Sequence, residues 1–213
     1  MSRFNHYAKT LESMTFEAVN KIKEAEEKYN KALSDHEAMP IRSGFVDYDY
    51  SIESQKRDLA LKEAEKHLKD IRESIPNQFM KDVTEMRSKL SDDLYRYFAV
   101  KPEDLSPETM SLLNSGYLNI NDFDKLMKAA IDDNNVTMIR MIGEKAAEIA
   151  KTTEDNSKRS VLSAVAHKAD VYTPESYLNA FDSFVSVSET CINRTKLLDS
   201  WDKLGMPEVL ESF

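Results

Sequence analysis

Residues 59–98 read LALKEAEKHLKDIRESIPNQFMKDVTEMRSKLSDDLYRYF. Apolar side chains recur in this stretch at steps of three and four residues, which places them along one side of an α-helix, close to a coiled-coil seam. Pro76 interrupts the pattern, and a proline inside a helix ends or kinks it. The stretch therefore predicts two helices in line, about 51–75 and 77–99, with one apolar side to cover. The apolar positions are Leu61, Ala64, Leu68, Ile71, Ile75, Phe79, Val83, Met86, Leu90, Leu94 and Tyr97.

Residues 5–38 carry a second narrow seam, and Pro40 and Gly44 end it. Acidic residues precede lysines by four positions on the other side, an order worth about 0.2–0.5 kcal/mol for each pair on a solvated face. We expect residues 1–99 to form an extended helical hairpin or three-helix arm, about 40 Å long and kinked near Pro76. Few core residues line so narrow an arm, so another chain or residues 100–213 should cover its apolar edge. The acid–base pairs are Glu17–Lys21, Glu24–Lys28 and Glu27–Lys31.

Aromatic residues gather in the connection between the two helices of the hairpin, at Phe45, Tyr48 and Tyr50. Two interpretations are open. They fold back to close the end of the hairpin, or they form an exposed anchor for a partner, since tyrosine is enriched at binding hot spots.

Short capped helices replace long ones after residue 100, which predicts a compact helical bundle over 100–213. Ser106-Pro107 and Thr173-Pro174 are helix starts, with the cap residue followed by proline at the first helical position. Asn121 is expected to cap a helix to Asp132. Further helices are expected at 136–151, around Val161 to Ala169, and from 174 toward Trp201. The predicted fold class is thus all-α: a long coiled-coil-like arm followed by a smaller bundle.

Composition narrows the classes of partner. The 213 residues contain 38 acids and 29 bases, a net charge of −9, with −2 over 1–98 and −7 over 99–213. Because phosphate binding needs a basic stripe, nucleic acid is not expected as a partner. No apolar run approaches the roughly 20 residues of a membrane span, and no secretory signal is visible. A single cysteine, Cys191, excludes an intrachain disulfide, and we expect a cytoplasmic protein.

The usual marks of catalysis are missing from the sequence. His6, His36, His67 and His167 are far apart and lack metal-ligand spacing. Cys191 lies near an apolar stripe and is expected to be a buried small side chain rather than a nucleophile. A calcium loop starting at Asp133 fails because its sixth residue is Met138 instead of glycine. We therefore expect no catalytic residue, no cofactor and no metal.

Residues 106–119, SPETMSLLNSGYLN, followed by the capped helix to Ala130, resemble the short helix–glycine–helix units of small acidic proteins from the structural operons of tailed phages. With the arm that precedes them, the layout looks like helical virion-assembly proteins, a class of scaffolds and minor structural proteins. The resemblance implies a structural role and no functional residue. Phage scaffolds commonly end in a basic tail, whereas this chain ends LGMPEVLESF, which argues against the scaffold variant.

The first functional hypothesis is a non-enzymatic structural protein that self-associates or docks a protein partner along its helical seams, with phage virion assembly as the expected setting. A homo-oligomer is expected under this hypothesis. The alternatives are an acidic inhibitor or regulator that binds a basic protein, and a helical enzyme with dispersed site residues. The expected partner-binding residues are Phe45, Tyr48, Tyr50, Leu61, Leu68 and Ile71.

Overall fold

A computed structural model describes residues 3–39, 48–115 and 117–204, with the side chains of Tyr48, Asp49 and 202–204 left out. These residues form seven α-helices and two 3-10 helices, and no strand occurs among them. The predicted all-α class, with long N-terminal helices followed by shorter ones, is confirmed. The α-helices are α1 (Asn5–Glu37), α2 (Tyr48–Tyr97), α3 (Pro107–Asn114), α4 (Ile120–Asp132), α5 (Val136–Thr152), α6 (Asn156–Val171) and α7 (Pro174–Asn193), and the 3-10 helices are η1 (Pro102–Asp104) and η2 (Thr195–Leu204).

The chain divides into two compact units. Unit 1 contains Met1–Ser88 and Phe181–Phe213, and unit 2 contains Lys89–Ala180. The expected division, with an arm over 1–99 and a bundle over 100–213, assigned the whole second half to the bundle. The structure groups Phe181–Phe213 with residues 1–88 instead, because side chains within 181–201 pack on α1 and α2. Both α2 and α7 cross the division as continuous helices.

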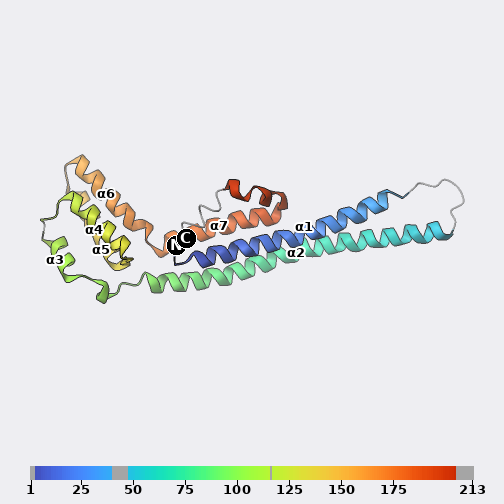
Figure 1. Ribbon diagram of the computed structural model, residues 1–213, viewed down its shortest axis with the longest axis horizontal. Helices are drawn as coiled ribbons and strands as arrows, with labels where there is room; N and C mark the ends of the chain where they lie inside the picture. The colour runs from blue at the N-terminus through green and yellow to red at the C-terminus, as the bar shows by residue number, and fades with distance from the viewer. Residues whose placement is uncertain (1–2, 40–47, 116, 205–213) are drawn as a thin grey trace. The chain divides into compact units, whose positions relative to one another are not determined.

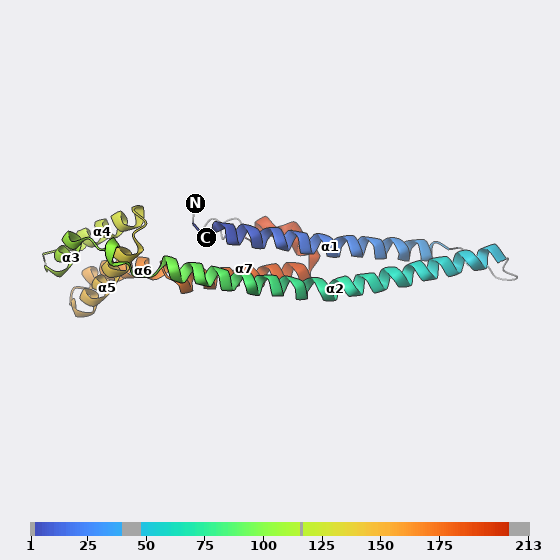
Figure 2. The same ribbon diagram turned by 90° about the horizontal axis from the view of Figure 1, so that it is seen from below.

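The hairpin of unit 1 consists of α1 and α2 running antiparallel, side by side (Figures 1 and 2). Polar contacts bridge the two helices at several points along their length. His36 Nε2 lies 2.7 Å from Asp58 Oδ1, and Arg72 Nη2 donates to Glu26 Oε1 at 2.9 Å. From the first contact to the second, α1 runs back ten residues and α2 runs forward fourteen, a difference of about one helical turn that the long Arg72 side chain spans.

Helix α2 continues through Pro76 as one helix of 50 residues, so the expected division into two helices at this proline is wrong. Proline removes one backbone donor, which leaves the carbonyl four residues earlier without its usual partner. The Asn77 side chain donates to the Glu73 carbonyl at 2.9 Å in the same turn. We attribute the continuity to packing on both sides of the proline, where Leu68 and Phe79 are buried.

A third layer covers part of the hairpin. Phe181–Asn193 of α7 and the 3-10 helix η2 lie along α1 and α2, where Arg87 binds Asp182 through two bonds of 2.7 and 2.8 Å. Lys23 Nζ lies 2.8 Å from Asp199 Oδ1. The core that results is drawn from all three layers. It includes Leu11, Val19, Ile22, Phe79, Val83, Phe181, Phe184, Cys191, Ile192 and Trp201, each at most 5% exposed.

Unit 2 is a small bundle whose core lies among α3, α4, α5 and α6. The α5 and α6 helices approach so closely that a Cβ at Gly143 would lie 2.3 Å from the Ala169 Cβ. Asn135 caps α5 by accepting from the Met138 N–H at 2.9 Å, and its amide donates to the Asp104 carbonyl at 2.7 Å. The core residues are Leu113, Phe123, Met127, Ala130, Met138, Ile139, Ile142, Ala146, Ala150, Leu162, Val165 and Ala169.

Local capping signals agree with the structure at some helix ends and differ at others. Ser106 caps α3, accepting from the Thr109 N–H at 3.2 Å, as expected. The cap of α4 is Asn119 instead of Asn121, because Asn119 and Asp122 bond each other's backbone N–H in a capping box. The last predicted helix is interrupted: α7 ends at Asn193, and a 3-10 helix follows.

Candidate functional site

Burial changes along the hairpin of unit 1. Buried side chains on α1 end at Ala25, and on α2 they begin at Leu68. We call the remaining described residues, 26–39 and 50–67, the distal hairpin, and none of them is buried. Beyond Glu26, which accepts from the Thr195 hydroxyl, no described segment of unit 1 lies on the distal hairpin as a third layer (Figure 1). The half-buried seam positions of the distal hairpin are Tyr29, Ala32, Leu33, Ile52, Leu61 and Ala64.

Polar contacts close the distal hairpin where apolar burial is weak. Arg57 is at the centre: its Nη1 donates to the Asp35 carbonyl at 2.6 Å, and its Nε donates to Glu53 at 3.0 Å. His36 and Asp58 form the adjacent contact at 2.7 Å. All these groups are at least partly solvated, so such pairs contribute little free energy, about 0–1 kcal/mol each. These polar contacts align the two helices, but the apolar seam between them stays partly exposed to solvent.

An open groove of about 570 Å³ follows one flank of the distal hairpin. Ala32 of α1, half-buried, and Ala60 of α2, exposed, line it, and their short side chains leave space beside the helices unfilled. We call it the distal groove, and its other lining residues are Lys28, Lys31, Asp35, Glu53, Lys56 and Arg57.

The distal groove is basic within an acidic protein. Four of its side chains are cationic and two are anionic, and one anion, Glu53, already binds Arg57. Lys28, Lys31 and Lys56 are exposed, and none makes an ion pair or hydrogen bond within the described parts of the chain. The expected pairs Glu24–Lys28 and Glu27–Lys31 do not form there, whereas Glu17–Lys21 does, at 2.6 Å.

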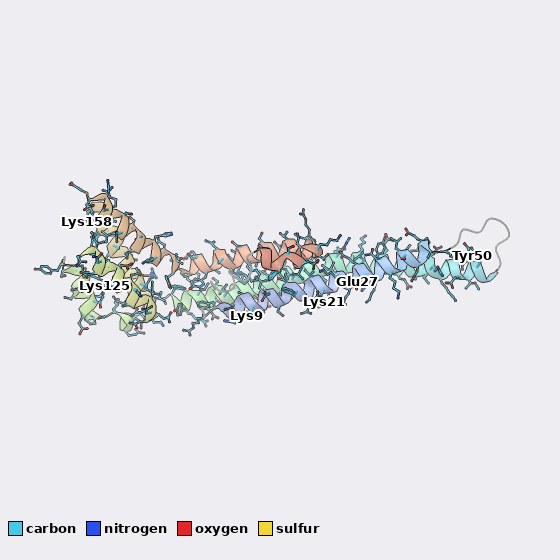
Figure 3. The ribbon with its side chains drawn as sticks, turned by 45° about the horizontal axis from the view of Figure 1, so that its top comes forward. Lys9, Lys21, Glu27, Tyr50, Lys125 and Lys158 are labelled. Atoms are coloured by element: carbon cyan, nitrogen blue, oxygen red, sulfur yellow. The ribbon has the colours of Figure 1, made fainter. Side chains whose placement is uncertain are left out.

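The distal groove lies on the flank of α1 away from the third layer. The C-terminal segment contacts α1 at Glu12, Lys23 and Glu26. At 3.6 residues per turn, Lys28 and Lys31 lie on the other side of α1 from these three residues. Figure 3 shows Lys21, Glu27 and Tyr50 in succession toward the far end of the hairpin.

A smaller hollow of about 100 Å³ lies on the same flank, nearer the start of α1. Its charges are already engaged. Lys21 holds the pKa of Glu17 below its ordinary value, first through their hydrogen bond and then through its charge. Asp82 accepts from Gln78 at 2.7 Å. This hollow therefore lacks the unpaired cations of the distal groove.

The predicted partner-binding residues fall into two sets. Phe45 lies outside the described residues, and Tyr48 begins α2 with its side chain undescribed, while Tyr50 is half-buried. Leu61 and Ile71 are half-buried and Leu68 is 9% exposed. These three share the seam side of α2, so the hairpin itself uses them, and docking through them stays a prediction.

Sequence reasoning missed the lysines of the distal groove, because exposed lysines on a helix usually indicate only a solvated face. A signal was present beside them. Ala18, Ala25 and Ala32 recur every seven residues on the seam of α1. A seam filled by alanine at each heptad packs helices closely and leaves space beside them. The two hollows lie at Ala18 and Ala32.

The groups considered for catalysis are not assembled into a site. Cys191 is 0% exposed, and burial raises the pKa of its thiol, which disfavours the thiolate needed for nucleophilic chemistry. Within residues 3–39, 48–115 and 117–204, no three histidine, cysteine or carboxylate side chains gather as metal ligands would. No helix in those ranges combines the length and apolar character needed to cross a bilayer.

Comparison with family models, curated proteins and solved structures finds no match to this chain.

Proposed function

We propose that this chain is a non-enzymatic structural protein that docks a protein partner through its distal hairpin. The observation that carries the proposal is the contrast along the hairpin. Residues covered by the third layer form a dry core, whereas 26–39 and 50–67 have no buried side chain among those described. Two helices bury only a stripe, so the half-exposed seam gains stability from any segment that covers it.

Several features support binding over catalysis. The half-exposed seam includes Tyr29, Leu33 and Leu61, large side chains that a docking partner would remove from water. The arm is long: 33 residues of α1 at 1.5 Å each extend about 50 Å. A long, incompletely buried arm suits assembly of a larger structure. Virion assembly, suggested by the sequence resemblance, is part of this proposal, and self-association is its nearest variant.

Hydrogen exchange with mass spectrometry, together with light scattering, tests the proposal on the full chain. We expect amides of 50–67 to exchange much faster than those of 79–94, because the distal hairpin lacks the contacts that resist local opening. Concentration-dependent protection of 50–67, with a mass above the 24.4 kDa monomer, would identify a second copy as the partner.

Equal protection of both segments in a monomer at every concentration would overturn the proposal. In that case the hairpin is complete without a partner. The acidic-regulator alternative has no separate structural observation in its favour and stays a prediction.

A further inference from the structure

The distal groove has a chemistry of its own that goes beyond an uncovered seam. Resting on the proposed docking function, we propose that it binds an acidic α-helical segment of the partner protein. Two alanines line the groove together with three exposed ammonium groups, those of Lys28, Lys31 and Lys56, which outnumber its one carboxylate outside the Arg57–Glu53 pair.

Shape favours a helix as the occupant. The groove extends over 28–35 of α1 and 53–60 of α2, about 12 Å at 1.5 Å per residue, which matches two helical turns. Ala32 and Ala60 leave room for apolar side chains of an incoming helix at its i and i+4 positions. Such a helix packs against the open flank of the hairpin, opposite to the third layer.

Charge selects an acidic helix. Lys28 and Lys31 lie on one wall and Lys56 on the other, so carboxylates on both sides of an apolar stripe meet a cation on each wall. In the hollow at Ala18 the one cation, Lys21, is paired with Glu17, so that hollow offers no such selection. Complementary charge of this kind mainly sets specificity and the rate of association.

Nucleic acid is the competing occupant, and the surroundings disfavour it. A phosphate backbone longer than the groove would meet exposed carboxylates of the same hairpin at Glu27, Glu63 and Glu65. The three lysines do not form a continuous basic stripe, and the alanines beside them offer no aromatic surface for base stacking.

Fluorescence anisotropy of the full-length protein tests the proposal. The probe is a labelled helical peptide of about 20 residues, long enough to be partly helical alone, with a leucine stripe flanked by glutamates. Its matched control replaces every glutamate by lysine, and a labelled single-stranded oligothymidine reports nucleic-acid binding. We expect the acidic peptide alone to bind, and its affinity to fall as salt rises.

Two charge-reversed variants localise the binding. The triple variant Lys28→Glu, Lys31→Glu, Lys56→Glu should bind the acidic peptide at least about tenfold more weakly, since each lost or inverted contact weakens a partly solvated ion pair. The matched variant Lys9→Glu, Lys69→Glu, Lys81→Glu changes the same charge on exposed positions of α1 and α2 outside the distal hairpin. It should stay within about twofold of the wild type, because distant exposed charges are screened.

Four results overturn the inference. They are no binding of the acidic peptide, equal binding of both peptides, tighter binding of the oligothymidine, and an equal loss in the two variants. Circular dichroism confirms that each variant is folded. If the distal hairpin exchanges rapidly but the peptides are not discriminated, this inference fails and the proposed function survives. If amides of the distal hairpin are fully protected from exchange in the monomer, the proposed function itself is wrong.

Discussion

The indole N–H of Trp201 donates to the Glu12 carboxylate at 3.0 Å and joins positions 189 residues apart. The ring also lies 5.3 Å from the Phe16 ring and 5.8 Å from the Phe184 ring, centroid to centroid. Trp201 is 5% exposed. One side chain therefore holds η2, α7 and α1 together, and the third layer of unit 1 depends on it.

Truncating this side chain should loosen the third layer. We expect Trp201→Ala to lower the free energy of unfolding of unit 1 by about 3–5 kcal/mol, as for other buried aromatic residues. Trp201→Phe keeps an aromatic ring but loses the N–H bond and part of the indole volume, so it should cost less than Trp201→Ala and more than the roughly 1 kcal/mol of the hydrogen bond alone. Urea titration followed by circular dichroism measures both free energies. Tryptophan fluorescence does not serve here, because Trp201 is the only tryptophan and both variants remove it. An unchanged midpoint for Trp201→Ala would contradict the packing of η2 on the arm.

Gly143 lies where α5 and α6 approach each other closely. Glycine to alanine in a helix interior normally stabilises by about 1 kcal/mol, through helix propensity. Here the new Cβ would lie 2.3 Å from the Ala169 Cβ, so overpacking should reverse the sign. We expect Gly143→Ala to destabilise unit 2 by about 1–3 kcal/mol in thermal or urea unfolding. The exposed neighbour offers the control: Glu144→Ala should be nearly neutral, and a more stable Gly143→Ala protein would refute the close approach.

Pro76 lies inside a continuous helix and so should be replaceable. Pro76→Ala restores a backbone donor to the carbonyl of Arg72 and removes the ring clash. We expect a gain in the stability of unit 1 of about 1–3 kcal/mol, bounded by the propensity difference between the two residues. Denaturant midpoints by tryptophan fluorescence provide the measurement. A loss of stability would show that the proline sets a bend on which the packing depends.

The carboxylate of Asp124 and the ammonium of Lys168 link α4 to α6 at 2.6 Å. This hydrogen bond, followed by the charge of Lys168, lowers the pKa of Asp124 from its ordinary value. A lowered folded-state pKa adds stability above the unfolded value of about 3.9, and this stability is lost as pH falls through the folded pKa. Carboxyl NMR titration should show the pKa of Asp124 rising in Lys168→Gln. The exposed Lys158→Gln on the same helix should leave it unchanged, and equal shifts would contradict the pairing.

The thiol of Cys191 should resist chemical modification in the folded protein. Its side chain is fully buried and its pKa is raised by desolvation, so both access and thiolate formation are disfavoured. We expect aromatic disulfide reagents at pH 8 to react more than about a hundredfold faster after unfolding in urea. A variant combining Cys191→Ala with Thr190→Cys moves the thiol to an exposed position and should react at once. Rapid reaction of native Cys191 would contradict its place in the core.

Much of the secondary structure was predictable because it depends on neighbours within one or two turns. The step of three and four residues in 59–98 predicts a helix, and Ser106 caps the helix that follows it. The prediction that the helix divides at Pro76 was wrong because it also used only local rules. The local cost of the proline is real, but it is offset by burial of side chains on both sides of it, which a local rule does not include.

The sequence by itself determined that this chain is helical, that long helices come before short ones, and that its net charge is −9. Only the tertiary structure decided that residues 181–204 pack on the arm, that Gly143 meets Ala169, and that Lys28, Lys31 and Lys56 share one groove. The physical reason is range. Periodicity and capping act between residues within a few positions, whereas burial and charge clustering depend on residues that folding brings together from distant parts of the chain.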